Sequence, residues 1–129
     1  MKQELIKIVL VEPQGSLNLG SVARVCKNFG ITDLRLVSPR CNPNDLEANK
    51  MALKGRNILK KATKHKSLLE AISDCPRVIA TCGRKEHGDI PLQKTHEALS
   101  WLSQSKEETP LAIVFGREDR GLTNQELLM

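Results

Sequence analysis

The stretch LIKIVLVEPQGSLNLGSVARVCKNFGITDLRLVSP, residues 5–39, has the pattern of a strand–helix–strand unit. Leu5 to Val11 are almost all aliphatic or β-branched, as expected for a strand that is buried on both faces. From Leu19 to Phe29 apolar residues recur at helical spacing, and Gly30 is expected to end the helix. A second strand is predicted at Leu34–Val37. The unit therefore predicts two parallel strands joined by a right-handed crossover.

The rest of the chain repeats this alternation. The predicted elements are a helix capped by Asn44, a helix from Ser67 to about Ser73, a strand at Arg77–Cys82, a helix from Leu92 to about Ser103, a strand at Leu111–Phe115 and a helix from Thr123. This order predicts an α/β fold around a parallel sheet. We expect one domain, residues 1–129, which is incomplete at its C-terminus because the last helix has room for little more than one turn.

The charge of the chain favours a polyanionic partner. Lys and Arg outnumber Asp and Glu by 20 to 15, for a net charge of +5. No acidic residue interrupts one basic run, which consists of Lys50, Lys54, Arg56, Lys60, Lys61, Lys64 and Lys66. Such a run forms either a surface that follows nucleic-acid phosphates or an ordinary solvated face. Aromatic residues are scarce, so RNA contacts are expected to rest on phosphates and shape rather than on base stacking.

Composition also disfavours several classes of protein. The cysteines, Cys26, Cys41, Cys75 and Cys82, form no Cys-x-x-Cys pair and do not cluster with the histidines, so no metal site is predicted. No segment has the length and apolarity of a membrane span, and the N-terminus does not resemble a signal peptide. We therefore predict a cytoplasmic protein that contacts no membrane. Dinucleotide-binding and Walker-type phosphate loops are absent as motifs.

Glycine-containing segments follow three of the predicted strands: 18–24, 81–84 and 116–121. Because parallel strands end at one edge of a sheet, the segments are expected to converge there on a ligand. We expect Arg24 to lie near a helix N-terminus, where exposed backbone N–H groups favour anions. Taken singly, Arg24 is better explained by a local surface ion pair, and the segment after Phe115 by an ordinary strand-to-helix turn.

Two motifs give the chain a family resemblance. Residues 18–24 (NLGSVAR) and 115–122 (FGREDRGL) resemble the first and second motifs of the SpoU (TrmH-type) branch of the SPOUT RNA methyltransferases. Residues 9–14 (VLVEPQ) and 36–40 (LVSPR) are similar to its TrmJ-like group, which methylates a ribose 2′-hydroxyl in the tRNA anticodon loop. The resemblance covers nearly the whole chain, but the third motif of the family has no counterpart.

This resemblance implies a Rossmann-like SPOUT domain whose C-terminal trefoil knot is truncated here, a homodimer, and S-adenosylmethionine as methyl donor. It implies that Arg24 activates the 2′-hydroxyl, that Asn18 shapes the active loop and that Glu118 braces this loop. The residues implied to hold the donor are Thr81, Cys82, Gly83, Gly116 and Arg117. Arg84 falls where the TrmJ-like group places a further RNA-binding or active-site arginine, and we count it with the expected RNA-binding residues. We add the basic residues Lys54, Arg56, Lys60 and Lys61 to the expected RNA surface.

The chemistry of Arg24 needs a physical interpretation, because an arginine with a pKa above about 12 is a poor base. We expect its guanidinium to hold the adjacent phosphate and to stabilise the developing alkoxide. The sequence thus predicts an S-adenosylmethionine-dependent RNA ribose 2′-O-methyltransferase, with tRNA favoured over rRNA as substrate. The alternatives are a catalytically inactive, truncated RNA-binding domain and, more weakly supported, a flavodoxin-like nucleotide-binding protein.

Overall fold

The structure is a computed structural model in which residues 3–81 and 109–117 are described. Within these ranges a five-stranded, all-parallel sheet has the strand order β3-β2-β1-β5-β4. The strands are β1 (Ile6–Val11), β2 (Asp33–Val37), β3 (Thr63–His65), β4 (Arg77–Ala80) and β5 (Leu111–Phe115). The helices are α1 (Ser16–Asn28), α2 (Leu46–Ala52), α3 (Arg56–Lys61) and α4 (Leu68–Ala71), with short 3-10 turns η1 (Gln3–Leu5) and η2 (Leu53–Gly55). The predicted α/β fold with a parallel sheet is confirmed.

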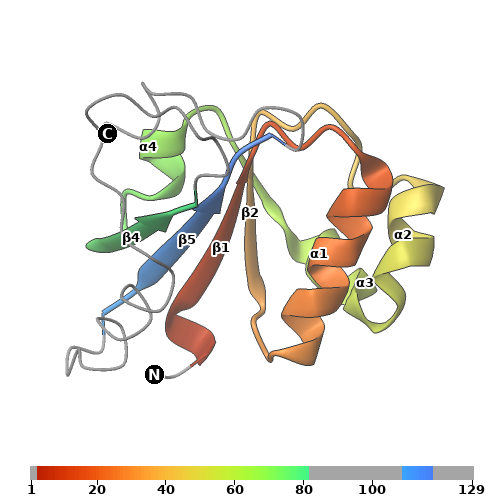
Figure 1. Cartoon of the computed structure of the whole chain (residues 1–129), viewed down its shortest axis with the longest axis horizontal. Helices are drawn as coiled ribbons and strands as arrows, with labels where there is room; N and C mark the ends of the chain where they lie inside the picture. Colours follow the sequence, from red (N-terminus) through yellow and green to blue (C-terminus); the bar gives the residue numbers. More distant parts are fainter. Residues whose placement is uncertain (1–2, 82–108, 118–129) are drawn as a thin grey trace.

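Helices cover both faces of the sheet (Figure 1). α1, α2 and α3 lie on one side, and α4 lies on the other. Side chains alternate along the strands, so β1 contributes Ile8 and Leu10 to the core under α1 and Val9 and Val11 to the core beside α4. Burial on both faces explains why β1 is apolar at nearly every position.

The strand order reverses next to β1. This strand pairs with β2 on one side and with β5 on the other, so that Ile8 lies opposite both Leu34 and Ile113. The chain moves from β1 outward through β2 and β3, and then continues on the far edge with β4 before β5 fills the place beside β1. Because β1 and β5 are parallel neighbours, the segments that follow them begin at the same edge of the sheet, beside the reversal of strand order, which is where open α/β sheets bind ligands.

The first helix starts earlier than predicted. It begins at Ser16 rather than Leu19, with the extended backbone of Gly15 at the N-cap and a bond from Leu19 N–H to Gly15 C=O. Leu17, the apolar residue of the first turn before Leu19, is exposed and falls outside the helical spacing of Val22, Cys26 and Phe29, so the pattern gave no sign of this turn. The cap of α2 was also wrong by one residue, because the side chain of Asp45, not Asn44, accepts the bond from Glu47 N–H.

The chain after α2 contains both confirmed and missed elements. The Ser67 cap of α4 is confirmed, and β5 has the predicted bounds. α3 and β3 were missed, because they are short and lie in the basic run, where Ile58 and Leu59 alone mark the buried side. The predicted helices from Leu92 and from Thr123 lie outside the described residues.

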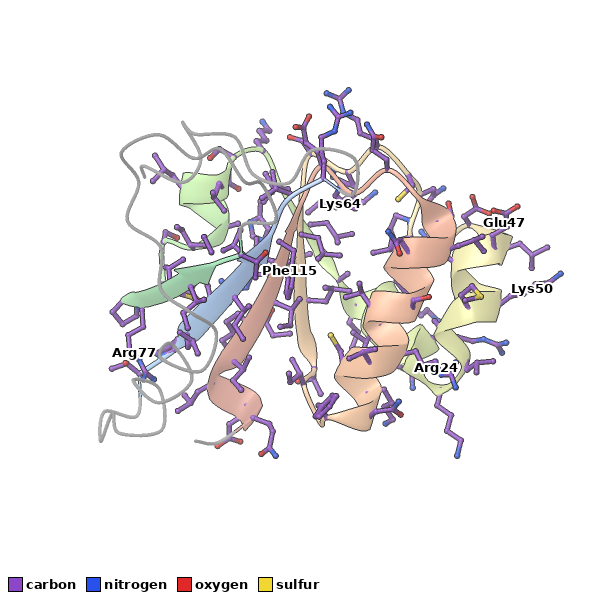
Figure 2. The ribbon with its side chains drawn as sticks, viewed as in Figure 1. Arg24, Glu47, Lys50, Lys64, Arg77 and Phe115 are labelled. Atoms are coloured by element: carbon purple, nitrogen blue, oxygen red, sulfur yellow. The ribbon has the colours of Figure 1, made fainter. Side chains whose placement is uncertain are left out.

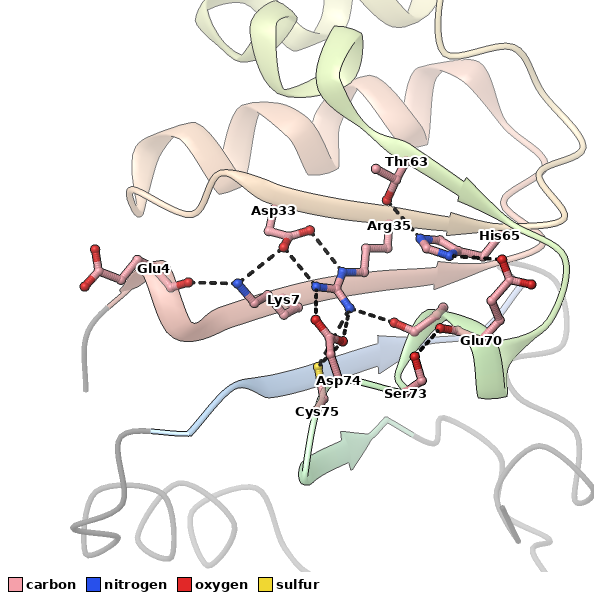
Figure 3. Close-up of polar contacts among 11 residues, drawn as sticks. Glu4, Lys7, Asp33, Arg35, Thr63, His65, Glu70, Ser73, Asp74 and Cys75 are labelled. Carbon is pink, nitrogen blue, oxygen red and sulfur yellow. Dashed lines mark hydrogen bonds and ion pairs between the residues drawn. The ribbon is translucent and has the colours of Figure 1, made fainter.

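A buried arginine ties the sheet to the segment before β4 (Figure 3). The Arg35 guanidinium donates to both carboxylate oxygens of Asp33 at 3.1 and 3.0 Å and of Asp74 at 2.6 and 2.9 Å, and it reaches Ala71 C=O at 2.7 Å. Lys7 Nζ lies 3.3 Å from Asp33. The hydrogen bonds from Arg35 hold the pKa of Asp74 well below its usual range. Burial raises the pKa of Asp33, but the bonds and charges of Arg35 and Lys7 outweigh burial and lower it.

This cluster predicts a measurable loss of stability in Arg35→Met. The variant should lower the free energy of unfolding in urea by about 2 to 3 kcal/mol, because the Ala71 carbonyl and the carboxylates of Asp33 and Asp74 lose the hydrogen bonds that Arg35 donates. The loss stays below that of a fully buried pair, since the Asp74 side chain is 55% exposed. Arg40→Met is the matched control. It breaks the exposed Arg40–Glu12 pair and should cost less than about 1 kcal/mol. Equal losses in the two variants would contradict this account.

Candidate functional site

Two strands end in backbone conformations that non-glycine residues rarely adopt. Glu12 and Ser38, directly after β1 and β2, have φ of 50° and 44°. Both are held by the neighbouring strand, since Glu12 N–H donates to Val37 C=O at 2.7 Å and Ser38 N–H donates to His65 C=O at 3.0 Å. The ion pair between Arg40 and Glu12, at 2.8 Å, joins the two segments again. Strained backbone that is fixed in this way is common at binding sites.

A pocket of about 380 Å³ opens beside this edge, between α1 and strands β1 and β5. It is lined by Ile8, Leu10, Pro13, Asn18, Leu19, Ser21, Val22, Val25, Cys26, Ile31, Phe115 and Gly116. Its walls are mostly apolar, and the polar groups at its surface come from Asn18, Ser21 and the Gly116 backbone. Predicted site residues from the first and second glycine segments thus lie in one pocket. A concave apolar pocket with a few polar groups is typical of small-molecule sites.

The ends of β4 and β5 lie side by side. Thr81 donates to Val114 C=O through its backbone N–H at 2.9 Å and through its hydroxyl at 3.1 Å, so it extends the pairing of the two strands. Arg117 crosses to the segment after β1, where the Gln14 side-chain oxygen accepts from its Nε at 3.2 Å and its Nη2 at 2.6 Å. Thr81, Gly116 and Arg117 therefore share the edge predicted for them. Cys82, Gly83, Arg84 and Glu118 lie outside the described residues.

Arg24 lies elsewhere, and this corrects the prediction. Because α1 begins at Ser16, Arg24 falls in the second half of the helix rather than near its N-terminus. It lines a separate cleft of about 530 Å³ together with Asn28, Leu53, Lys54 and Arg56. Figure 2 shows Arg24 beside α2 and α3, on the side of α1 that faces away from Phe115. Within one chain, Arg24 and Gly116 do not share a pocket.

The basic run divides at this cleft. Lys54 and Arg56 line it, while Lys60 and Lys61, in the last turn of α3, are exposed outside it. The four predicted RNA-binding residues of this run are therefore exposed, but only Lys54 and Arg56 line the cleft with Arg24.

Two glycines serve packing rather than ligand approach. A Cβ at Gly20 would collide with the backbone of Ala48 and would lie 2.7 Å from Met51 Cβ. A Cβ at Gly55 would collide with the backbone of Ala23 and would lie 2.9 Å from the Arg24 nitrogen. At both positions the backbone of α1 lies directly against the backbone of a neighbouring element. Gly55, a glycine inside the basic run, is the sequence signal that could have predicted its contact with α1.

Other predicted features have a plain structural reading. Cys26 and Cys75 are buried, and burial raises the pKa of each thiol to about 11. Across residues 3–81 and 109–117, no three His, Cys, Asp or Glu side chains are grouped so that they could hold a metal ion. In the same two ranges, no helix has the length and apolarity to cross a membrane.

Comparisons with known proteins identify a family and similar chains. Residues 5–128 match the SpoU rRNA Methylase family. The tRNA (cytidine/uridine-2′-O-)-methyltransferase TrmJ of Yersinia pestis (strain Pestoides F) is 38% identical over 122 residues, which are 95% of this chain and 47% of that protein. The tRNA (cytidine-2′-O-)-methyltransferase TrmJ of Methanocaldococcus jannaschii is 41% identical over 125 residues, which are 95% and 54% of the two chains.

A solved structure shows the same fold. TrmJ from Z. mobilis ZM4 superposes with a TM-score of 0.84 at 33% identity, over 95% of this chain and 54% of that one. The chain spans about half the length of the relatives it matches.

The glycine contact predicts that Gly55→Ala lowers the free energy of unfolding by about 2 kcal/mol or more, because α1 and the η2 turn must move apart. The measurement is urea unfolding followed by circular dichroism. Gly15→Ala is the control, since its Cβ would meet Asn18 Cβ at an ordinary 3.7 Å. In Gly15→Ala, the loss of glycine at the N-cap destabilises the helix, while the reduced freedom of the unfolded chain stabilises the fold. The free energy of unfolding of this variant should therefore stay within about 1 kcal/mol of wild type. A neutral Gly55→Ala would refute the contact.

Proposed function

Because the chain belongs to the SpoU rRNA methylase family, we propose that it acts in the S-adenosylmethionine-dependent methylation of a ribose 2′-hydroxyl in RNA, with tRNA as the favoured substrate. One observation carries the proposal: Asn18 and Gly116, far apart in sequence and drawn from two family motifs, line one pocket where the strand order reverses. The names of the relatives, tRNA 2′-O-methyltransferases, support tRNA over rRNA. Such a role would place the protein in the cytoplasm.

The described residues fit a methyl donor of this kind. The pocket offers an apolar wall that includes Phe115 and Val22, backbone groups of Gly116 and few other polar atoms, which suits an adenosine group with a short polar chain. We propose that Thr81, Gly116 and Arg117 hold the donor, together with Cys82 and Gly83. When bound, S-adenosylmethionine supplies an electrophilic methyl group.

The residues of α1 are proposed to act on the ribose. We propose that Arg24 holds a backbone phosphate and stabilises negative charge as the 2′-hydroxyl loses its proton, since its guanidinium is a poor base but a strong bidentate donor. Asn18 is proposed to shape the loop beside the acceptor, and Glu118 to brace it. The RNA surface is proposed to comprise Lys54, Arg56, Lys60, Lys61 and Arg84.

A second copy of the chain would reconcile the two separated clefts. The side chains of Leu17, Val25 and Phe29 are more than half exposed on the outer face of α1. Exposed apolar side chains in a row favour a protein interface. We propose that a homodimer forms there and brings Arg24 of one copy toward the donor pocket of the other.

The proposed activity is tested by mass spectrometry of tRNA nucleosides. Unmodified tRNA is incubated with S-adenosylmethionine and either the 129-residue chain or a chain extended beyond Met129 to the length of its relatives. A donor-dependent 2′-O-methylated nucleoside is expected, and calorimetry should show donor binding by the same protein. RNA binding without donor binding by both chains would overturn the proposal and identify an inactive RNA-binding domain.

Arg24→Lys tests the role of the guanidinium in whichever chain methylates. The variant keeps the charge but loses bidentate geometry, so kcat/KM should fall by about 10- to 100-fold while thermal stability is unchanged. Lys27→Arg, an exposed change on the same helix that lines neither pocket, is the matched control and should keep the wild-type rate. An unchanged rate in Arg24→Lys would remove the arginine from the mechanism.

A further inference from the structure

We propose that the cleft between α1 and the η2–α3 corner is a binding site for a single phosphate group of the RNA backbone, held jointly by Arg24, Lys54 and Arg56. The proposal rests on the proposed function for its substrate class. It goes beyond that function by separating these three cations from the rest of the basic run and by assigning them one ligand group.

The cleft is lined mainly by positively charged side chains. Three of the five lining residues are cations, the other two are Asn28 and Leu53, and no carboxylate contributes to the lining. Arg24, Lys54 and Arg56 form no ion pair with any of the residues that the structure describes. By contrast, Lys7, Arg35 and Arg40 each face a carboxylate. Like charges gathered without a counter-charge cost energy unless an anion joins them.

The packing of the corner fixes the spacing of these cations. Gly55 lies between Lys54 and Arg56 and packs directly on the backbone of Ala23 and Arg24. Leu53, the residue before Lys54, has φ of 50°, a strained value that turns the chain sharply out of α2. The two residues that flank Gly55 are therefore held beside Arg24 by a contact between backbones rather than by flexible side chains.

Arg56 is oriented before any ligand arrives. Its Nε donates to Asn49 C=O, near the end of α2, at 2.9 Å. This bond restrains the guanidinium and leaves its two Nη groups for another acceptor. Restrained guanidinium groups lose less entropy on binding and match the paired oxygens of a phosphate. Because no aromatic side chain lines the cleft, it offers nothing for a base to stack on, and phosphate is the part of RNA that it fits.

The test measures tRNA binding as a function of salt concentration, in the absence of donor. Lys54→Ala/Arg56→Ala should lower the affinity about tenfold and reduce the slope of log Kobs against log salt by about one, the change expected for one lost phosphate contact. The control, Lys64→Ala/Lys66→Ala, removes the same charge from the same basic run outside the cleft and should alter the slope much less. Circular dichroism checks that both variants fold.

Each result decides the proposal. Equal effects of the two double variants, or an unchanged slope for Lys54→Ala/Arg56→Ala, would overturn it in favour of a diffuse basic surface. Polyglutamate that competes as well as RNA at equal charge would overturn the phosphate assignment in favour of an acidic protein partner. The binding assay contains no donor, so its result is independent of methylation. If the variants lose affinity as expected but the separate nucleoside assay detects no methylation, the phosphate site stands and only the proposed methylation is refuted.

Discussion

The position of α1 depends on two contacts in which its backbone meets that of a neighbouring element. Gly20 packs against α2, and Gly55 brings the η2 turn onto α1. At both positions a methyl group would occupy space that the partner backbone fills, so the separation of these elements is set by the absence of a side chain. The apolar pocket on one side of α1 and the basic cleft on the other both take their shape from this placement.

The charged residues divide into two groups with different physical roles. Arg35 is buried, and its donors are used by Asp33, Asp74 and the Ala71 carbonyl, so it links β2 to the segment before β4. Arg24, Lys54 and Arg56 are exposed, and the described residues give them no carboxylate partner. A guanidinium whose donors are all used stabilises a fold, whereas one with unused donors is available to a ligand.

The candidate site consists of two separate parts, an apolar pocket and a basic cleft. The edge where β1 and β5 end carries the Gly116 backbone and Asn18, and it suits a small donor molecule. The corner around Gly55 carries the cations and suits a polyanion. Both parts lie against the same helix, α1, and the homodimer proposed above is the arrangement that would bring them together.

The sequence by itself determined the fold class, β1, β5, the α4 cap and the family resemblance, because apolar runs, capping residues and motifs are local. It did not determine α3 and β3, whose few buried residues are hidden among lysines, or the start of α1, where the apolar residue of the first turn, Leu17, is exposed. Only the tertiary structure decided which residues face each other. The segments of Asn18 and Gly116 were expected to converge, but the fold alone revealed the pairing of β5 with β1 that puts them in one pocket. It also revealed the backbone contact at Gly55 that puts Arg24 in a cleft with Lys54 and Arg56. Neither fact follows from spacing along the chain, since each depends on how distant segments pack.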